Sequence, residues 1–414
     1  MQPLALGVDL GTSGVRVAVI DPDATLLHCS ALLYPSSLRH ADDWRACTKQ
    51  LIRAIPAELR DKIHAMAVDG TSGTLLACRT TGHPLGPALT YSESCIEQAE
   101  RLQTLASDGG PAASSSGSLA RALRLLDQHH DPDGDPVLLR HQADWLTGWL
   151  LQDWSFGEEG NNLRLGWQLE ESRWPKGFIG QPWTTALPEI RASGHLLGHL
   201  HPNVATSLGL MPTVRIVAGT TDANAAVLAA NPAQGDGITV LGTTLVLKQF
   251  TDAPLRGPGI TNHRVAGRWL CGGASNTGGG VLQQEFPGLD LDELSRQIDP
   301  EQSSGLHYRP LPNVGERFPY DDPALKPILE PRPVSDALHL HGLLEGMARI
   351  EAEGWRLLTR LGAQPPRRVV TIGGGARNPQ WRRLRERVLG RPVVSCQAPP
   401  AAGVARLAAQ HFQS

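Results

Sequence analysis

The stretch that decides the fold is LGVDLGTSGVRVAVID (Leu6 to Asp21), because its pattern returns later in the chain as GITVLGTTLVLKQF (Gly237 to Phe250). In both places a short apolar strand runs into a glycine and two hydroxyl residues, and then into a second apolar strand. This pattern predicts two β-hairpins with tight polar tips, Gly11-Thr12-Ser13 and Gly242-Thr243-Thr244. Glycine lets backbone N–H groups approach an anion closely, and the Thr and Ser hydroxyls donate hydrogen bonds to its oxygens. The repeat therefore indicates a duplicated phosphate clamp.

The bulk composition narrows the class of protein. The chain has 414 residues, 41% of them hydrophobic and 19% charged, with a formal net charge of −3. These values are typical of a folded protein of two or three domains that does not bind nucleic acid. The N-terminus has no basic start, and no apolar run is long enough to span a membrane, so we expect a cytoplasmic protein without a membrane partner. The six cysteines contain no CxxC pair, which favours reduced thiols and no zinc site made by protein ligands alone.

Strands alternate with helices along the chain, and this order predicts an α/β fold with mixed sheets. The segment IVAGTTDANAAVLAANP (Ile216 to Pro232) passes from a strand into a helix that begins near Asp222. We place the domain boundary here, with an N-terminal lobe over residues 1–228 and a C-terminal lobe over residues 229–414. The second lobe should contain a long amphipathic helix from about Ser335 to Leu361. Near its end, Arg367 to Cys396 reads as a strand, a glycine turn, a helix and a strand.

Two familiar nucleotide-binding motifs are absent. A P-loop needs GxxxxGK[ST], and the sequence contains no such string. A dinucleotide-binding turn needs a third glycine or alanine three residues after Gly375, and Asn378 stands at that position. No early GxGxxG follows the first strand either. What remains is a two-lobed arrangement. Asp9 and the first tip serve one lobe, and the second tip and Gly373-Gly374-Gly375 serve the other.

Five stretches in this order and spacing resemble the FGGY family of carbohydrate kinases. They are VDLGTSGVR, AVDGTSGTLL (Ala67 to Leu76), AGTTDANAA (Ala218 to Ala226), GTTLVL and TIGGGARNPQWRRLRERVLGRPV (Thr371 to Val393). The family lies within the actin, sugar-kinase and heat-shock chaperone ATPase superfamily. The resemblance implies a two-lobed actin-like ATPase (ribonuclease H-like) fold, with duplicated mixed-sheet domains around a central cleft. The AVDGTSGT string and the short chain are most similar to the ribulose and xylulose kinase branch.

The resemblance also implies an activity. An FGGY kinase transfers the γ-phosphate of ATP, with Mg²⁺, to a hydroxyl of a small sugar. We expect a ketopentose as acceptor, D-ribulose first and xylulose second, and we leave a homodimer open as the assembly. The alternative from a different class is a nucleotide-driven binding protein, in which the same fold changes a partner surface and no sugar is phosphorylated.

The resemblance assigns roles to three side chains of the acceptor site. Asp222 matches the family's catalytic base and also contacts the sugar, and a helix N-terminus there should favour its ionised form. Asp9 lies beside the magnesium and the sugar in the family, and Ser72 is placed to contact the sugar. An aspartate before a helix is often only an N-cap, and an aspartate before a glycine turn often caps that turn, so both alternatives stay open.

Further residues match the family's nucleotide-binding positions. The implied phosphate ligands come from the two tips, and the implied adenosine ligands come from the later glycine turn: Gly11, Thr12, Ser13, Gly242, Thr243, Thr244, Gly374, Gly375 and Asn378. Arg16 is either a phosphate ligand or a solvated strand residue, and Asp69 is expected to brace the turn that holds Ser72. Asn161 and Asn162 either border the sugar pocket or form a simple turn. The family often binds sugar hydroxyls through a Trp-Asp-x-Arg-like stretch, and here that place reads LTYSESC (Leu89 to Cys95).

Overall fold

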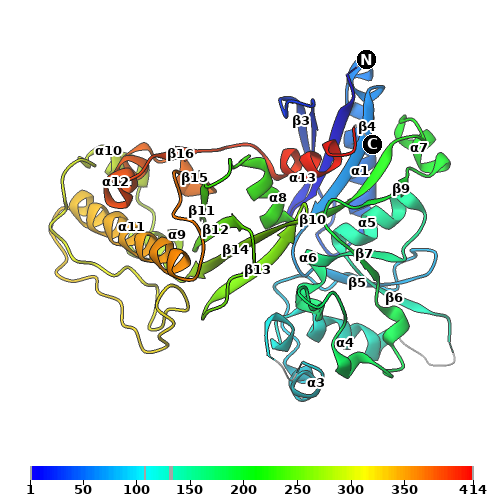
Figure 1. Ribbon diagram of the computed structural model, residues 1–414, viewed down its shortest axis with the longest axis horizontal. Coiled ribbons are helices and arrows are strands. Elements are labelled where there is room, and N and C mark those ends of the chain that lie inside the picture. Colours follow the sequence, from blue (N-terminus) through cyan, green and yellow to red (C-terminus); the bar gives the residue numbers. More distant parts are fainter. Residues whose placement is uncertain (1, 107–108, 130–133, 413–414) are drawn as a thin grey trace. The chain divides into compact units, whose positions relative to one another are not determined.

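The computed structural model describes residues 2–106, 109–129 and 134–412. The chain divides into two compact units (Figure 1). The first contains Met1–Ala229, Arg264–Gly267 and Pro399–Ser414, and the second contains Ala230–His263 and Arg268–Ala398. The domain ranges 1–228 and 229–414 stay a prediction, and the last helix of the chain is grouped by its contacts into the first unit. No helix in the described part of the chain is long and apolar enough to cross a membrane.

A mixed six-stranded sheet forms the centre of the first unit. Its strands lie in the order β3 (Leu26–Leu33), β2 (Gly14–Ile20), β1 (Leu4–Leu10), β4 (Ile63–Gly70), β10 (Arg215–Thr221) and β9 (Leu196–His199). Strands β1, β4 and β10 run parallel, whereas β2, β3 and β9 pair antiparallel with their neighbours. Two small sheets flank it, one of β5 (Leu75–Arg79) with β6 (Val137–His141), the other of β7 (Phe156–Glu158) with β8 (Glu189–Arg191).

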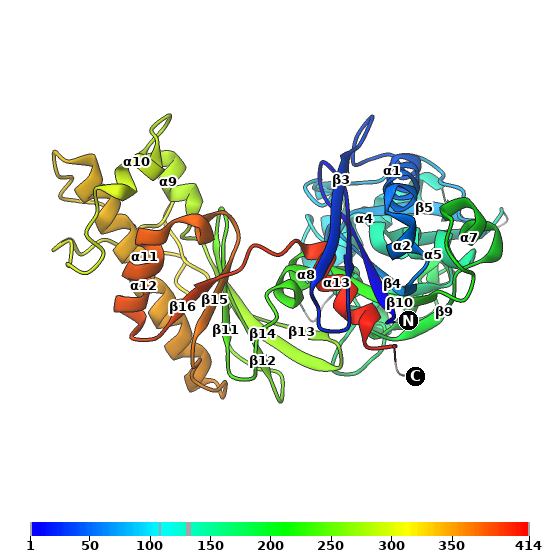
Figure 2. The same cartoon turned by 90° about the horizontal axis from the view of Figure 1, so that it is seen from above.

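Helices cover both faces of this sheet (Figure 2). On one face lie α1 (Ala41–Ala54) and α5 (Gln142–Leu151), and on the other lie α8 (Asp222–Ala229) and α13 (Pro400–Ala409). Helix α13 comes so close to β1 that a Cβ atom at Gly7 would lie 1.8 Å from the carbonyl oxygen of Ala401. The remaining helices of the unit are α2 (Ala57–Arg60), α3 (Ala99–Leu105), α4 (Ser118–His129), α6 (Glu159–Asn162) and α7 (Pro202–Leu208).

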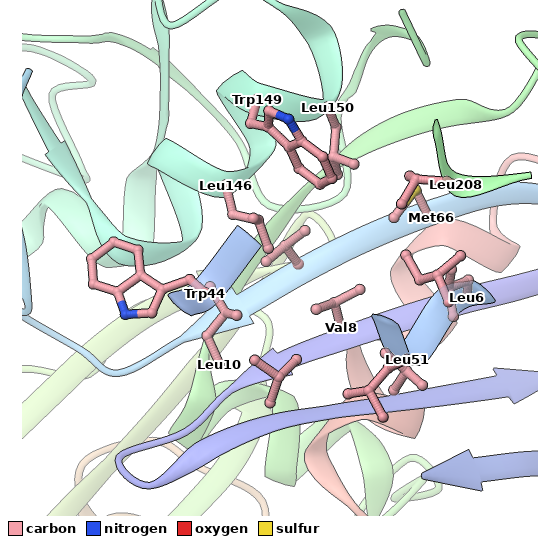
Figure 3. Packing of buried hydrophobic residues seen from close by; sticks show 14 of the residues in the cluster. Leu6, Val8, Leu10, Trp44, Leu51, Met66, Leu146, Trp149, Leu150 and Leu208 are labelled. Carbon is pink, nitrogen blue, oxygen red and sulfur yellow. The ribbon is translucent and has the colours of Figure 1, made fainter. Parts of the chain in front are cut away.

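The main core of the first unit lies between the sheet and its first helical layer. Figure 3 shows Leu6, Val8 and Leu10 of β1 among side chains that include Trp44 of α1 and Leu146 of α5, and all five are buried. Burying one large apolar side chain contributes about 1.5–3 kcal/mol, so this layer holds the strands in place. The alternation along β1 leaves its opposite face to smaller residues and to Asp9, which explains how a carboxylate comes to lie in an otherwise apolar strand.

The second unit repeats the arrangement. Its sheet has the order β13 (Ile260–Val265), β14 (Arg268–Ser275), β12 (Leu245–Thr251), β11 (Gly237–Leu241), β15 (Val369–Ile372) and β16 (Val393–Ser395). Strand β11 pairs antiparallel with β12 and parallel with β15, as β1 pairs with β2 and β4. The two predicted hairpins are therefore confirmed, and each contributes the central strand of its sheet. The helices of this unit are α9 (Gly279–Glu285), α10 (Leu291–Arg296), α11 (Asp336–Arg360) and α12 (Pro379–Leu389).

The predicted long helix is α11. It begins after Ser335, whose side chain accepts a hydrogen bond from the N–H of Leu338, and it ends before Gly362, which has a φ of 113°. A fully buried ion pair joins α11 to α12, with 2.6 Å between Arg385 Nε and Glu351 Oε2. Thr239 and Thr371, from the two central strands, complete this network. It fixes the helices behind the strands that carry the second tip and the later glycine turn.

Candidate active site

The first polar tip is a tight turn whose backbone groups are already bonded. The N–H of Gly11 donates to the carbonyl of Gly14 at 2.9 Å, and the Tyr34 hydroxyl donates to the carbonyl of Gly11 at 3.1 Å. Thr12 and Ser13 are exposed, and the Thr12 Oγ1 lies 3.3 Å from the Tyr91 hydroxyl. The Gly11 N–H is thus used within the turn, and the hydroxyls of Thr12 and Ser13 are exposed donors that this tip offers to an anion.

Three carboxylates gather at the ends of the parallel strands of the same unit. Asp9 of β1 stands beside Asp69 of β4 in the strand register, and Thr220 of β10 stands on the other side of Asp69. Burial raises the pKa of Asp9, although its hydrogen bond with Asp69 and the charge of Arg16 oppose that change. Burial and the negative charge of Asp9 raise the pKa of Asp69 well above its ordinary value. Asp222 follows Thr221 directly at the start of α8.

Asp69 is a fully buried carboxyl to which no group of the described residues donates a hydrogen bond in its ionised form. Two neighbouring carboxylates can share a hydrogen bond only when one of them carries a proton. Burial and the neighbouring carboxylates thus favour the neutral form of Asp69 more strongly than that of Asp9. Asp69 lies beside Asp9 and also precedes the turn that holds Ser72. Bracing that turn, its expected role, therefore does not account for all of its contacts.

Asp222 has the surroundings of a proton acceptor. It is partly exposed, and its Oδ1 accepts a hydrogen bond from the N–H of Ala223 at 2.7 Å. Burial raises its pKa to about 6, with a smaller contribution from the charge of Asp9, while backbone N–H groups of Ala223 and Ser72 oppose the rise. The helix N-terminus was expected to favour the ionised form, but loss of solvent outweighs it here. The result is a carboxyl that titrates close to neutral pH.

Arg16 and Ser72 lie beside these carboxylates. Arg16 stands opposite Asp9 across the β1–β2 pair, with its Nη1 3.4 Å from Asp9 Oδ2. Ser72 lies in the turn after β4, partly exposed, and its backbone N–H donates to Asp222. The structure thus brings Asp9, Ser72 and Asp222 together within the first unit. Their catalytic and sugar-binding roles stay a prediction.

The two asparagines of the segment EEGNNLRLG have buried side chains. Asn162 Nδ2 donates to Asp144 Oδ2 at 3.0 Å, and Asn161 lines a small pocket of about 10 Å³, enough for about one water. Both polar atoms of the Asn161 side chain lack a protein partner among the described residues. The alternative that Asn161 and Asn162 border the sugar pocket stays a prediction.

The second tip is built in the same way. The N–H of Gly242 donates to the carbonyl of Thr244 at 3.1 Å, while Gly242 and Thr243 are exposed. The start of α9 holds the tip, since the N–H of Gly279 donates to the carbonyl of Gly242 and that of Gly280 donates to the carbonyl of Thr243, both at 2.9 Å. The tip therefore presents its threonine side chains on a rigid base.

The later glycine turn follows β15 and lies beside Leu241 of the second tip. Gly373 has a φ of 91°, and residues Gly374–Arg377 form a short 3-10 helix. A Cβ at Gly374 would meet nothing within 4 Å, whereas one at Gly375 would lie 2.6 Å from the Trp381 ring. Gly374 thus leaves open space for a ligand, and Gly375 is required by packing inside the protein.

Asn378 ends this turn, and both polar atoms of its side-chain amide form hydrogen bonds. The oxygen accepts from the N–H of Trp381 at 3.0 Å and caps α12, and the nitrogen donates to Ser295 Oγ at 2.7 Å. The side chain therefore fixes the turn. The assignment of Asn378, with Gly374 and Gly375, to nucleotide binding stays a prediction.

Asp9 fits the expected contact to Mg²⁺. No group of three or more His, Cys, Asp or Glu in the described part of the chain could hold a metal ion. Mg²⁺, however, commonly takes only one or two carboxylates together with substrate phosphates and waters. Asp9, a carboxylate next to the first tip, is a donor of that kind.

Two of the sequence relatives are xylulose kinases. Those of Bacillus subtilis (strain 168) and Escherichia coli (strain K12) are each 24% identical to this chain, over 98% and 97% of it and 87% and 89% of their own lengths. The gluconokinase of Bacillus subtilis is 19% identical over 95% of this chain and 84% of its own.

Solved structures share the fold. The xylulose kinase from Rhodospirillum rubrum superposes with a TM-score of 0.79 at 19% identity, covering 98% of this chain and 89% of that one. The glycerol kinase of Plasmodium falciparum, solved with ADP, gives 0.81 at 17% identity, over 99% and 89%. The two units with their duplicated mixed sheets therefore have the actin-like ATPase fold, and the predicted fold class is confirmed.

Residues 235–411 match the C-terminal domain of the FGGY family of carbohydrate kinases. This match, together with the sugar kinases among the relatives, supports an ATP-using sugar kinase of the FGGY type. The alternative of a binding protein that phosphorylates no sugar is left to the experiment described below.

Sequence reasoning did not foresee three contacts that the structure places near the site. They are Tyr91 beside Thr12, Asp69 beside Asp9, and the start of α9 against the second tip. The repeated Val-Asp before each turn, in VDLGTS and VDGTS, is the signal that could have revealed Asp69. Tyr91 had no such signal, because its partner lies 79 residues away along the chain.

Proposed function

We propose that the protein transfers the γ-phosphate of ATP to a hydroxyl of a ketopentose, with D-ribulose as first choice and xylulose as second. The observation that carries the proposal is Asp222, a partly exposed carboxyl with a pKa of about 6 beside Asp9 and Ser72. A general base works best when its pKa lies near the working pH. The AVDGTSGT string supports ribulose, and the xylulose kinases among the relatives support a ketopentose in general.

In this mechanism Asp222 accepts the proton of the sugar hydroxyl as that oxygen bonds to the γ-phosphorus, and the bond from phosphorus to the departing ADP oxygen breaks. Asp9 and Ser72 orient the sugar. The hydroxyls of Thr12, Ser13, Thr243 and Thr244 donate to the phosphate oxygens, whose charge is spread in the transition state. Asp9 would also hold Mg²⁺, which neutralises phosphate charge when bound.

A coupled ADP-release screen over pentuloses, polyols and hexoses tests the acceptor. We expect the highest kcat/KM with D-ribulose, then xylulose, and a low rate of ADP release without sugar. Preference for a hexose or for glycerol would contradict the ketopentose assignment. Equal ADP release with every sugar and with none would contradict sugar phosphorylation itself. The homodimer and the cytoplasmic location stay predictions.

A further inference from the structure

Arg121 of α4 is a buried cation whose charge is not matched by a bonded carboxylate. Its side chain is fully buried, and burial lowers its pKa to about 10. Within residues 2–106, 109–129 and 134–412, its hydrogen bonds go to three main-chain carbonyls, and it forms no ion pair. A buried guanidinium without a carboxylate is costly to the fold, so its position calls for a reason other than stability.

The three carbonyls belong to two separate segments. Arg121 Nε donates to Gly73 at 2.9 Å, and Nη1 donates to Glu93 at 2.7 Å and to Tyr91 at 3.4 Å. Gly73 follows Ser72 in the turn after β4. One side chain therefore ties the turn after β4 to residues 91–93.

Each tied segment carries a group that contacts the candidate transfer site. The backbone N–H of Ser72 donates to the Asp222 carboxylate, and the Tyr91 hydroxyl lies 3.3 Å from Thr12 Oγ1. A shift of either segment would move the proposed base or the proposed phosphate ligand. A displacement of about 1 Å is enough to cost a factor of about a hundred in rate.

The local geometry requires an arginine. A planar guanidinium donates from several nitrogens at fixed angles, whereas a lysine ammonium is a single point of charge. Gly73 has a φ of 100°, and a Cβ there would lie 2.8 Å from Arg121 Nη2, so the turn is shaped around the guanidinium. Glu93, the acid in the tied segment, has its side chain engaged with the Thr90 N–H at 2.8 Å and with Arg39 at 3.3 Å.

We propose that Arg121 is a positioning residue for phosphoryl transfer, which holds Ser72 against Asp222 and Tyr91 against Thr12 by joining the backbones of their segments. The inference rests on the proposed function for its kinetic consequence, because Asp222 and Thr12 are the groups that it positions. Its structural half, the joining of two segments, does not depend on the identity of the sugar.

The test compares Arg121→Met and Arg121→Lys with the control Arg101→Met, in the full-length protein. Arg101 lies on α3 with its Nη1 2.8 Å from Asp127, and it is 41% exposed, so its loss removes a surface ion pair and one hydrogen bond to Gln98. We expect Arg121→Met to lower kcat with the best sugar by about tenfold to a hundredfold. The KM for ATP should stay within about twofold, and Arg101→Met should change neither value by more than that.

Hydrogen exchange provides the readout that is independent of activity. In Arg121→Met and Arg121→Lys, amides of residues 71–74 and 90–93 should exchange faster together, while those of β11 and β15 should not change. If Arg121→Met does not fold, Arg121→Lys decides the matter, with kcat lower by at least about threefold. Unchanged exchange in either segment, or a rise in the KM for ATP as large as the fall in kcat, would overturn the proposal. If the wild type phosphorylates no sugar, the proposed function is rejected. Hydrogen exchange alone then tests whether Arg121 joins the two segments.

Discussion

Asp222 combines two properties that a base for a sugar hydroxyl needs, partial exposure and a pKa raised toward neutrality. Replacing it by Asn keeps its size and its place at the start of α8 but removes the proton acceptor. We expect Asp222→Asn to bind ATP normally and to lose at least about a hundredfold in sugar phosphorylation, measured by ADP release. Turnover close to that of the wild type would refute the assignment.

The same carboxyl predicts a pH dependence. A base must be ionised to accept a proton, and burial raises the pKa of Asp222 to about 6. The kcat/KM for the sugar should therefore rise with pH through an inflection near 6 and level off above it, since this profile reports groups of the free enzyme. A profile that stays flat from pH 5 to pH 7.5 would contradict the raised pKa.

At the scale of the structural elements, the turn after β15 contains two glycines with different surroundings. Gly374 faces open space, and Gly375 packs against other side chains. Gly374→Ala adds a methyl group into open space and should leave the melting temperature unchanged, whereas Gly375→Ala drives one toward Trp381 and Leu241. We expect the second change to cost about 1–3 kcal/mol in the free energy of unfolding. If the nucleoside lies against this turn, Gly374→Leu should raise the KM for ATP by at least about fivefold while the protein stays folded. An unchanged KM would remove Gly374 from the nucleotide site.

Two of the ion pairs of helix α12, one fully buried and one more accessible, make a comparison of stability. Arg385→Met leaves Glu351 buried without its partner, and such a loss typically costs about 3–5 kcal/mol. Arg382→Met breaks the more accessible pair with Glu386, at 3.3 Å, and a weak hydrogen bond to the Val393 carbonyl, and should cost no more than about 1 kcal/mol. Urea unfolding of both variants measures the difference. Equal losses would mean that the buried network does not hold α11 and α12 behind the sheet.

The elements that sequence predicted well are those with a local pattern. Apolar strands that run into Gly-Thr tips gave both hairpins, and Ser335 and Gly362 marked the ends of α11. The parallel pairing of β1 with β4 and β10 has no such pattern, because it depends on which faces the helices cover. The packing of α13 against Gly7 was missed for the same reason, since a contact between the two ends of the chain leaves no trace in periodicity.

For the candidate site, the sequence predicted the residue types better than their surroundings. Asp9, Ser72 and Asp222 do lie together, but the raised pKa of Asp222 depends on solvent that the fold removes. Asn378 and Gly375 were expected at the nucleotide, and the structure also gives them internal partners in Ser295 and Trp381. A motif specifies which residue stands at a turn, whereas its hydrogen-bond partners come from distant elements.

The whole molecule poses the question of whether the two tips act on one phosphoryl group. Thr12 belongs to the first unit and Thr243 to the second, and each is exposed on a rigid turn. Replacing either by Ala should lower kcat by about tenfold or more, as expected for loss of one donor to the transferring group. If both donate to the same group, the double variant should lose less than the product of the two effects, with a coupling above about 0.5 kcal/mol. Thr12→Ala combined with Thr251→Ala, whose hydroxyl donates to the carbonyl of Ala253 at 2.8 Å, is the additive control. Additive losses in the Thr12 and Thr243 pair as well would mean that the tips serve independent sites, and the duplicated hairpins would then reflect the history of the fold rather than a shared clamp.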